Sequence, residues 1–337
     1  MHIVPDREHA LLNRFQRDFP LCEAPYAEIA TRLATTQDWV LAKLRRFIGE
    51  GTVSRVGAIF RPGSVGVSTL AAMAVPRARL ADVARRISAH PGVNHNYERE
   101  HRFNLWFVAH APDRARLASL VAAIERETVL PVVSLPLVRE YCIDLGFALD
   151  GARHGGVTPL AHGGLPLPAE LDADDLRIAA ALQEGLPLTP RPFAAIAAKA
   201  DLPPPEGEAR VIHRLYDWLR EGTVKRVGVI VRHRELGYVA NVMAVWDVPD
   251  GEVDVLGEAL SQEPGVTLCY RRERALPAWP YNLFCMIHGR DRDEVESSVD
   301  AIARRQGLSS FPHARLFSRT AFKQRGALSF ASASLHG

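Results

Sequence analysis

The sequence has few cysteines and almost no net charge. Its four cysteines, Cys22, Cys142, Cys269 and Cys285, form no CxxC pair and follow no metal-ligand spacing. This argues against a disulfide framework and a structural zinc site, and it fits a reducing cytoplasm. With 41 Lys and Arg residues against 39 Asp and Glu residues, the net charge is +2. That value argues neither for nor against a polyanionic partner, so local clustering of charge must decide.

Long hydrophobic runs are also missing. No apolar stretch is long enough to span a bilayer, and residues 1–8 contain no apolar region of the kind found in signal peptides. We therefore expect a soluble cytoplasmic protein without a membrane partner. The length of 337 residues leaves room for two to four domains.

The most informative feature present is an internal repeat. The segment Glu50–Gly57 (EGTVSRVG) returns as Glu221–Gly228 (EGTVKRVG), and Asn104-Leu105-Trp106 returns as Asn282-Leu283-Phe284. The paired segments are about 170 to 180 residues apart and keep their order, which indicates a tandem duplication of a whole unit. Two fused copies predict a pseudo-dimer within one chain, in which one copy can do what the other does not.

Each copy begins with the pattern of a winged helix-turn-helix. In the first copy, apolar spacing predicts helices over 8–19 and 26–33, and a third helix that Thr36 caps and Gly51 ends. Alternation over 53–60 then predicts the strand of a β-wing. We expect winged helix-turn-helix domains over residues 1–63 and again over 171–235.

The second section of each copy reads strand, helix, strand, strand, helix, strand. This order predicts a ferredoxin-like βαββαβ domain over residues 64–150 and a second one over 236–326. The fold class is therefore α+β, a tandem repeat of winged helix-turn-helix and ferredoxin-like domains. Residues 151–170 are rich in Gly, Pro and His and predict a linker, and residues 327–337 predict a frayed tail.

One central strand of the first ferredoxin-like domain is unusually polar. Because side chains alternate along a strand, we expect one face of 94–101 to carry His95, Tyr97, Arg99 and His101. On the next strand, alternation places Asn104 and Trp106 on this same sheet face and Phe103, Leu105 and Phe107 under the helices. A solvated sheet surface, or a polar interface between the copies, would also explain a strand of this kind.

The second copy keeps part of this polar face. The matching positions are Leu268, Tyr270, Arg272 and Arg274, followed by Tyr281, Asn282 and Phe284. Arginine recognises carboxylates, histidine transfers protons near neutral pH, and aromatic rings stack on flat ligands. The pattern favours a pocket for a flat ligand with several carboxylates. Proton transfer would be concentrated in the first copy, because leucine replaces His95 and arginine replaces His101 in the second.

These motifs closely resemble the signature of the siroheme decarboxylases. The resemblance rests on 95–101 (HNYEREH) with 104–107 (NLWF), on 269–274 (CYRRER), and on 279–289 (WPYNLFCMIHG). The strand ends 141–147 and 319–323 also match. The arrangement is similar to the fused form in which a D-type and an L-type subunit share one chain.

The resemblance implies an Lrp/AsnC-like architecture and a carboxy-lyase. The substrate would be siroheme, whose C12 and C18 acetates lose CO2 to give 12,18-didecarboxysiroheme for haem d1, or for haem by an alternative route. No added cofactor is expected. We assign catalysis to His95, His101, Tyr97 and Arg99, with the histidines as proton donors. We assign substrate binding to Asn104, Trp106, Tyr270, Arg272, Arg274, Tyr281 and Asn282. His110 or His288 could ligate the siroheme iron, although each also fits an ordinary core or surface histidine.

Two other functions stay open. The layout also fits an Lrp/AsnC-like regulator of DNA, but acidic residues at the start of the recognition helices, in 36–39 and 206–208, would repel phosphate. We therefore do not expect DNA as a partner. A tetrapyrrole carrier or sensor without catalysis would need the same arginines. Expected protein partners are homologous decarboxylase subunits or a second copy of the chain.

Overall fold

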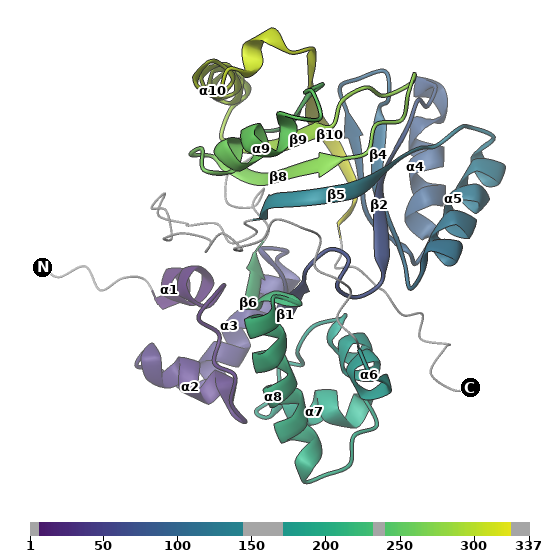
Figure 1. Ribbon diagram of the computed structural model, residues 1–337. Coiled ribbons are helices and arrows are strands. Elements are labelled where there is room, and N and C mark those ends of the chain that lie inside the picture. The colour runs from purple at the N-terminus through teal and green to yellow at the C-terminus, as the bar shows by residue number, and fades with distance from the viewer. Residues whose placement is uncertain (1–6, 144–170, 232–239, 325–337) are drawn as a thin grey trace, which may run out of the picture.

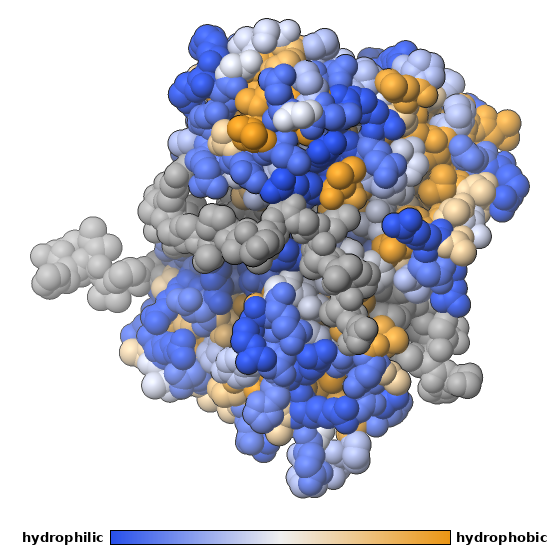
Figure 2. All heavy atoms as spheres, in the orientation of Figure 1, coloured by the Kyte–Doolittle hydropathy of each residue, from blue (hydrophilic) through white to orange (hydrophobic). Residues whose placement is uncertain are grey.

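The computed structural model describes residues 7–143, 171–231 and 240–324, so the predicted linker and tail lie outside the described residues. Figure 1 shows two layers, a strand-rich layer with helices on its outside and a helical layer below it. On the face drawn in Figure 2, hydrophobic residues form patches interspersed with hydrophilic ones. None of the described helices is long and apolar enough to cross a membrane.

The helical layer contains three helices from each copy. They are α1 (Arg7–Arg14), α2 (Pro25–Arg32) and α3 (Gln37–Gly49), then α6 (Ala173–Leu182), α7 (Pro192–Lys199) and α8 (Glu206–Glu221). Thr36 caps α3 as predicted, because its side chain accepts a hydrogen bond from the Trp39 amide at 3.2 Å. The six helices share one hydrophobic core, in which Leu11 of the first copy and Trp218 of the second are both fully buried.

The strands that follow these helices pair with each other. Strand β1 (Val53–Phe60) runs antiparallel to β6 (Val224–Val231), with Gly57 opposite Gly228. The predicted wing strands are present, but they pair with each other, so neither copy forms a wing hairpin of its own. Each copy supplies a single strand here, and the hydrogen-bonding groups on its edge are satisfied by the matching strand of the other copy.

The other layer is a closed barrel of eight strands made by both ferredoxin-like domains. The first copy supplies β2 (Val67–Met73), α4 (Leu80–Ala89, after a 3-10 turn at Arg77–Arg79), β3 (Val93–Arg99), β4 (Leu105–Ala111), α5 (Arg114–Thr128) and β5 (Val133–Ile143). The second supplies β7 (Ala240–Trp246), α9 (Val253–Ser261), β8 (Val266–Arg272), β9 (Leu283–Gly289), α10 (Arg292–Arg305), a 3-10 turn (Leu308–Ser310) and β10 (His313–Gln324). The α+β tandem-repeat prediction is confirmed.

The barrel closes because strands of one copy pair with strands of the other. Its order is β10-β3-β4-β2-β5-β8-β9-β7, in which the last strand of each ferredoxin-like domain pairs with the second strand of the other, β5 with β8 and β10 with β3. No sheet edge is left open within the barrel, so the two copies form one continuous hydrogen-bonded unit.

The apolar residues of the barrel divide into an outer set and an inner set. Leu105 and Phe107 pack under the helices of the first copy, as predicted. The interior contains Ala72, Trp106, Leu135, Met243, Val245, Phe284 and Leu316. Phe103 belongs to the interior set and not to the helix side, so that prediction is wrong. It precedes β4, where the alternation of a regular strand does not apply.

Candidate functional site

Strand β3 points three of the predicted site residues into the barrel. The Asn96 amide donates to the Ala84 carbonyl and to Ser88 Oγ, both at 3.0 Å, in α4. Because neighbouring side chains alternate, His95, Tyr97 and Arg99 point the opposite way, into the interior. The His95 ring stacks on Tyr97 with centroids 6.1 Å apart, and the Arg99 guanidinium lies 5.8 Å from the centre of the Tyr97 ring. The predicted shared face is confirmed for these three.

His101 does not share this face. Strand β3 ends at Arg99, whose amide donates to the Asn104 carbonyl at 2.9 Å and begins a turn. The His101 Nδ1 accepts from the Phe103 amide at 3.1 Å, and its ring meets Trp279 edge to face at 5.4 Å. His95 therefore begins the inward-facing row and His101 lies past its other end, so the two histidines would contact different parts of any large ligand.

An aromatic cluster fills the interior at the His101 end. At its centre is Trp279, which is fully buried and lies 4.9 Å from Trp106 and 5.0 Å from Tyr281, centroid to centroid. Trp106 Nε1 also donates to the Phe103 carbonyl at 2.7 Å. Two of the predicted substrate-binding residues thus belong to a packed cluster. Trp279 is part of the motif 279–289, but its position between them could not be predicted from strand alternation.

The two repeated asparagines bind the protein's own main chain. Asn104 accepts from the Val75 amide at 2.9 Å and donates to the Val75 carbonyl at 2.8 Å. Asn282 does the same at Val248, at 3.0 and 2.9 Å. Each amide holds the main chain just after the first strand of its own ferredoxin-like domain, β2 or β7. These bonds occupy both ends of the amide, which explains why the residue recurs at this place in both copies.

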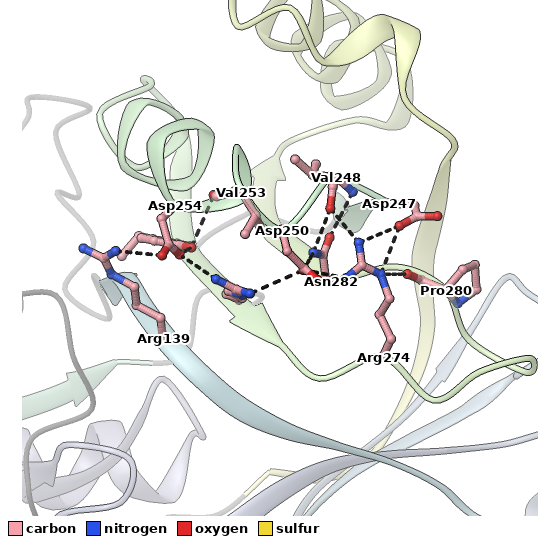
Figure 3. Close-up of polar contacts among 11 residues, drawn as sticks. Arg139, Asp247, Val248, Asp250, Val253, Asp254, Arg274, Pro280 and Asn282 are labelled. Carbon is pink, nitrogen blue, oxygen red and sulfur yellow. Dashed lines mark hydrogen bonds and ion pairs between the residues drawn. The ribbon is translucent and has the colours of Figure 1, made fainter.

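Arg274 lies in a charged network outside the barrel interior, shown in Figure 3. Strand β8 ends at Arg272, so the prediction that Arg274 shares its face is wrong. The Arg274 guanidinium contacts Asp247 at 2.8 Å and Asp250 at 2.7 Å, and it donates to the carbonyls of Val248 and Pro280. Two carboxylates within the chain already balance its charge.

Unlike Arg274, Arg99 and Arg272 contact no carboxylate among the described residues. Arg99 donates to the Leu316 carbonyl at 3.0 Å, and Arg272 donates to the Leu135 carbonyl at 2.9 Å, in equivalent positions of the two copies. The Arg272 guanidinium also lies 5.2 Å from the centre of the Tyr270 ring.

Neither of these guanidinium groups forms an ion pair with a carboxylate in the described parts of the chain. Burial lowers the pKa of each to about 10. A buried cation without a counter-ion is unfavourable, and a ligand carboxylate would relieve that cost. This pair is the clearest indication of an anionic ligand.

Solvent reaches the interior at the end that faces β1 and β6. Inward-pointing side chains there are partly exposed, although they lie inside a closed barrel; they are Leu70, His95, Tyr97, Val108, Tyr270, Met286 and His288. Arginine, tyrosine and histidine side chains together with apolar ones suit a ligand that is flat, apolar in its middle and carboxylated at its rim.

Three histidines near this end are held neutral. Burial lowers the pKa of His95, His110 and His288 from 6.5 to about 4, and the charges of Arg55 and Arg99 add to the effect at His95 and His288 respectively. His288 Nδ1 lies 3.0 Å from Thr267 Oγ1. His110 packs so closely on Gly66 that a Cβ there would come within 2.9 Å of its Nε2. The described residues contain no group of three or more His, Cys, Asp or Glu side chains that could hold a metal.

These values predict a loss of stability in acid. Unfolding returns His110 from a pKa of about 4 to 6.5, so the unfolded chain binds the extra proton. The contribution to stability is complete above pH 6.5 and is lost as the pH falls towards 4, by up to ~3 kcal/mol. We expect urea unfolding of His110→Gln to depend less on pH in this range than that of the wild type. An identical pH dependence in both proteins would contradict the assignment.

The surroundings of Tyr270 in the second copy differ from those of Tyr97 in the first. Lys225 of β6 forms an ion pair with Glu140 of β5, and their side chains are 14% and 12% exposed. Glu140 pairs across the strands with Tyr270, whereas the residue opposite Tyr97 is Ala321. The first copy therefore has Ala321 and His95 beside its tyrosine, while the second copy has an internal ion pair and Leu268.

The fold and the site define a fused pair of AsnC-like ligand-binding units on helix-turn-helix domains. The model of the AsnC-like ligand binding domain matches residues 64–141 and 235–323. The model of the siroheme decarboxylase NirDL-like HTH domain matches residues 8–53 and 175–224.

Known proteins identify the family. The siroheme decarboxylase NirDL subunit of Paracoccus denitrificans is 46% identical over 327 residues, which is 96% of this chain and 97% of the relative. The NirD subunit of Pseudomonas aeruginosa is 48% identical over 150 residues, 44% of this chain and 100% of its own length. The chain belongs to the siroheme decarboxylase family, in the fused NirDL form, and the predicted family of carboxy-lyases is confirmed.

Two crystal structures resemble the whole chain. One is the siroheme decarboxylase NirDL, at 27% identity and a TM-score of 0.68, covering 97% of this chain and 95% of that one. The other is NirDL in complex with an iron-uroporphyrin III analogue, at 26% identity and a TM-score of 0.66, covering 97% and 94%.

Proposed function

We propose that this chain removes CO2 from the C12 and C18 acetates of siroheme and yields 12,18-didecarboxysiroheme for haem d1 biosynthesis. The observation that carries this proposal is the pair Arg99 and Arg272. Arg99 is buried and Arg272 is half-buried; each contacts a tyrosine ring and has no carboxylate partner in the described chain. Carboxylates of siroheme would supply the missing counter-ions in an environment of low dielectric, where such pairing is strong.

The reaction needs little more than binding and a proton. When the bond between the acetate methylene and its carboxyl group breaks, the electron pair stays on the methylene carbon and is delocalised into the conjugated macrocycle. CO2 leaves, and one proton added at that carbon gives the methyl group. We assign this proton to His95, which lies beside Tyr97 at the solvent-reached end. His95 is neutral in the ligand-free chain, so the negative charge of the bound carboxylates must raise its pKa before it can donate. His101 remains a second candidate acid for a different part of the ligand.

The difference between the copies favours chemistry on the side of the first copy. His95 and Ala321 flank Tyr97, whereas Leu268 and the Lys225–Glu140 ion pair surround Tyr270. In this proposal Arg272 holds a carboxylate of the same ligand across the barrel and does not serve a second reaction centre.

Incubation of the purified chain with siroheme without oxygen, followed by mass analysis of the extracted tetrapyrrole, tests the function. We expect the loss of two CO2 units per siroheme. Loss of one unit would assign the other step to a homologous subunit. Binding without any mass change would favour a carrier or sensor, and absence of binding, together with salt-dependent binding to duplex DNA, would favour a regulator.

A further inference from the structure

The repeated wing segments carry an arginine that the two copies use differently. Arg226 in β6 is buried, and its guanidinium donates to the carbonyls of Gln16 and Val229. Its counterpart Arg55 in β1 has no ion pair in the described residues; the Nε of each arginine is buried without an acceptor, so the two differ in the carbonyl contacts that only Arg226 makes. Burial lowers the pKa of Arg55, and no anionic group among the described residues opposes that effect.

Arg55 is held between the two layers. Its side chain lies against Gly185, where an added Cβ would come within 3.1 Å of Arg55 Cδ. Gly185 has a φ of 103°, which favours glycine, and the next residue, Leu186, donates its amide to the Val56 carbonyl at 2.7 Å. The turn after α6 of the second copy thus confines the side chain on one side. On the other, Arg55 is close enough to His95 for its charge to disfavour the protonated imidazole.

We propose that Arg55 is a substrate-binding residue supplied by the helix-turn-helix layer, and that it holds the acetate carboxylate of the tetrapyrrole that lies beside His95. This inference rests on the proposed function, because it names a further residue of the same site. A carboxylate at Arg55 would give this cation a counter-ion, which the described residues do not supply. Its negative charge would also favour a protonated His95 once the ligand is bound, which places the proton where the mechanism needs it.

The experiment compares two iron porphyrins that differ in their acetates. Iron-uroporphyrin III carries acetates and propionates, whereas iron-coproporphyrin III has methyl groups in place of the acetates. We expect Arg55→Gln to raise the Kd for iron-uroporphyrin III by roughly 10- to 100-fold and to leave the Kd for iron-coproporphyrin III within about 3-fold, because one charge-assisted hydrogen bond is lost. Arg55→Lys, which keeps the charge, should lose less.

Arg45→Gln is the matched control. Arg45 lies on α3 in the same layer, and it donates to the Leu188 carbonyl at an exposed position. The control should bind both porphyrins like the wild type. Unchanged affinity of folded Arg55→Gln for iron-uroporphyrin III would overturn the inference, and so would equal losses for the two porphyrins.

The two proposals fail in distinguishable ways. A wild-type chain that binds iron-uroporphyrin III through Arg55 but leaves the mass of siroheme unchanged would refute the decarboxylase and keep Arg55 as a carboxylate-binding residue. A wild-type chain that binds neither porphyrin would refute both.

Discussion

Replacing His95 by leucine is expected to lower the rate of CO2 release from siroheme by about 10²–10⁴-fold, the usual contribution of a positioned proton donor. Leucine is the residue at the matching position of the second copy, Leu268, which lies in the equivalent strand β8. The substitution should therefore leave the barrel folded. Siroheme affinity should change little, because Arg99 and Arg272 are untouched. Single-turnover kinetics without oxygen, with binding measured separately, would separate the two effects.

His101→Ala is the paired variant for this test. His101 lies at the aromatic end, so it would serve a different acetate from His95 if both histidines donate protons. In that case His101→Ala should accumulate a product that has lost one CO2. Normal turnover in His101→Ala would remove His101 from the mechanism, and normal turnover in His95→Leu would refute the assignment made for the first copy.

The second large effect is expected on binding. Arg99→Gln and Arg272→Gln should each weaken siroheme binding by about 2–5 kcal/mol, the range found when one partner of a buried charge pair is removed. The ligand-free protein should lose far less stability, because removal of an uncompensated buried cation offsets the lost hydrogen bond to Leu316 or Leu135. Equilibrium titration with siroheme and chemical unfolding of the ligand-free variants measure the two quantities.

Arg274→Gln is the control variant, for which we expect a change in stability and not in siroheme affinity. The charge of Arg274 is balanced by Asp247 and Asp250, so its loss should lower stability and leave siroheme affinity nearly unchanged. If Arg274→Gln weakened binding as much as Arg99→Gln, the distinction between paired and unpaired guanidinium groups would not identify the site.

Much of the fold follows from repetition and local rules. The recurrence of EGTVxRVG predicts two copies, and the spacing of apolar residues predicts their elements; α2 at Pro25–Arg32 lies within one residue of the predicted helix over 26–33. Gly51 and Gly222 adopt φ values of 85° and 81° where helices end, a conformation that glycine adopts readily. Alternation also places His95, Tyr97 and Arg99 correctly on one face.

What the sequence could not supply depends on contacts between distant segments. The pairing of β1 with β6, and of β5 with β8, is decided by the association of the copies and not by either strand alone. His101 and Arg274 were misplaced because a turn stops each strand at the preceding arginine, and alternation does not reveal where it ends. Arg55 was missed because the same motif contains Arg226, and only the structure shows that their partners differ.

The most direct measurement is a crystal structure of this chain with iron-uroporphyrin III bound. The site described here predicts carboxylate oxygens within ~3 Å of the Arg99 and Arg272 guanidinium groups, the distance of a charge-assisted hydrogen bond. The macrocycle should lie inside the barrel, at the end next to His95 and Tyr97. A porphyrin bound elsewhere, with both guanidinium groups still bonded only to the carbonyls of Leu316 and Leu135, would contradict the central claim.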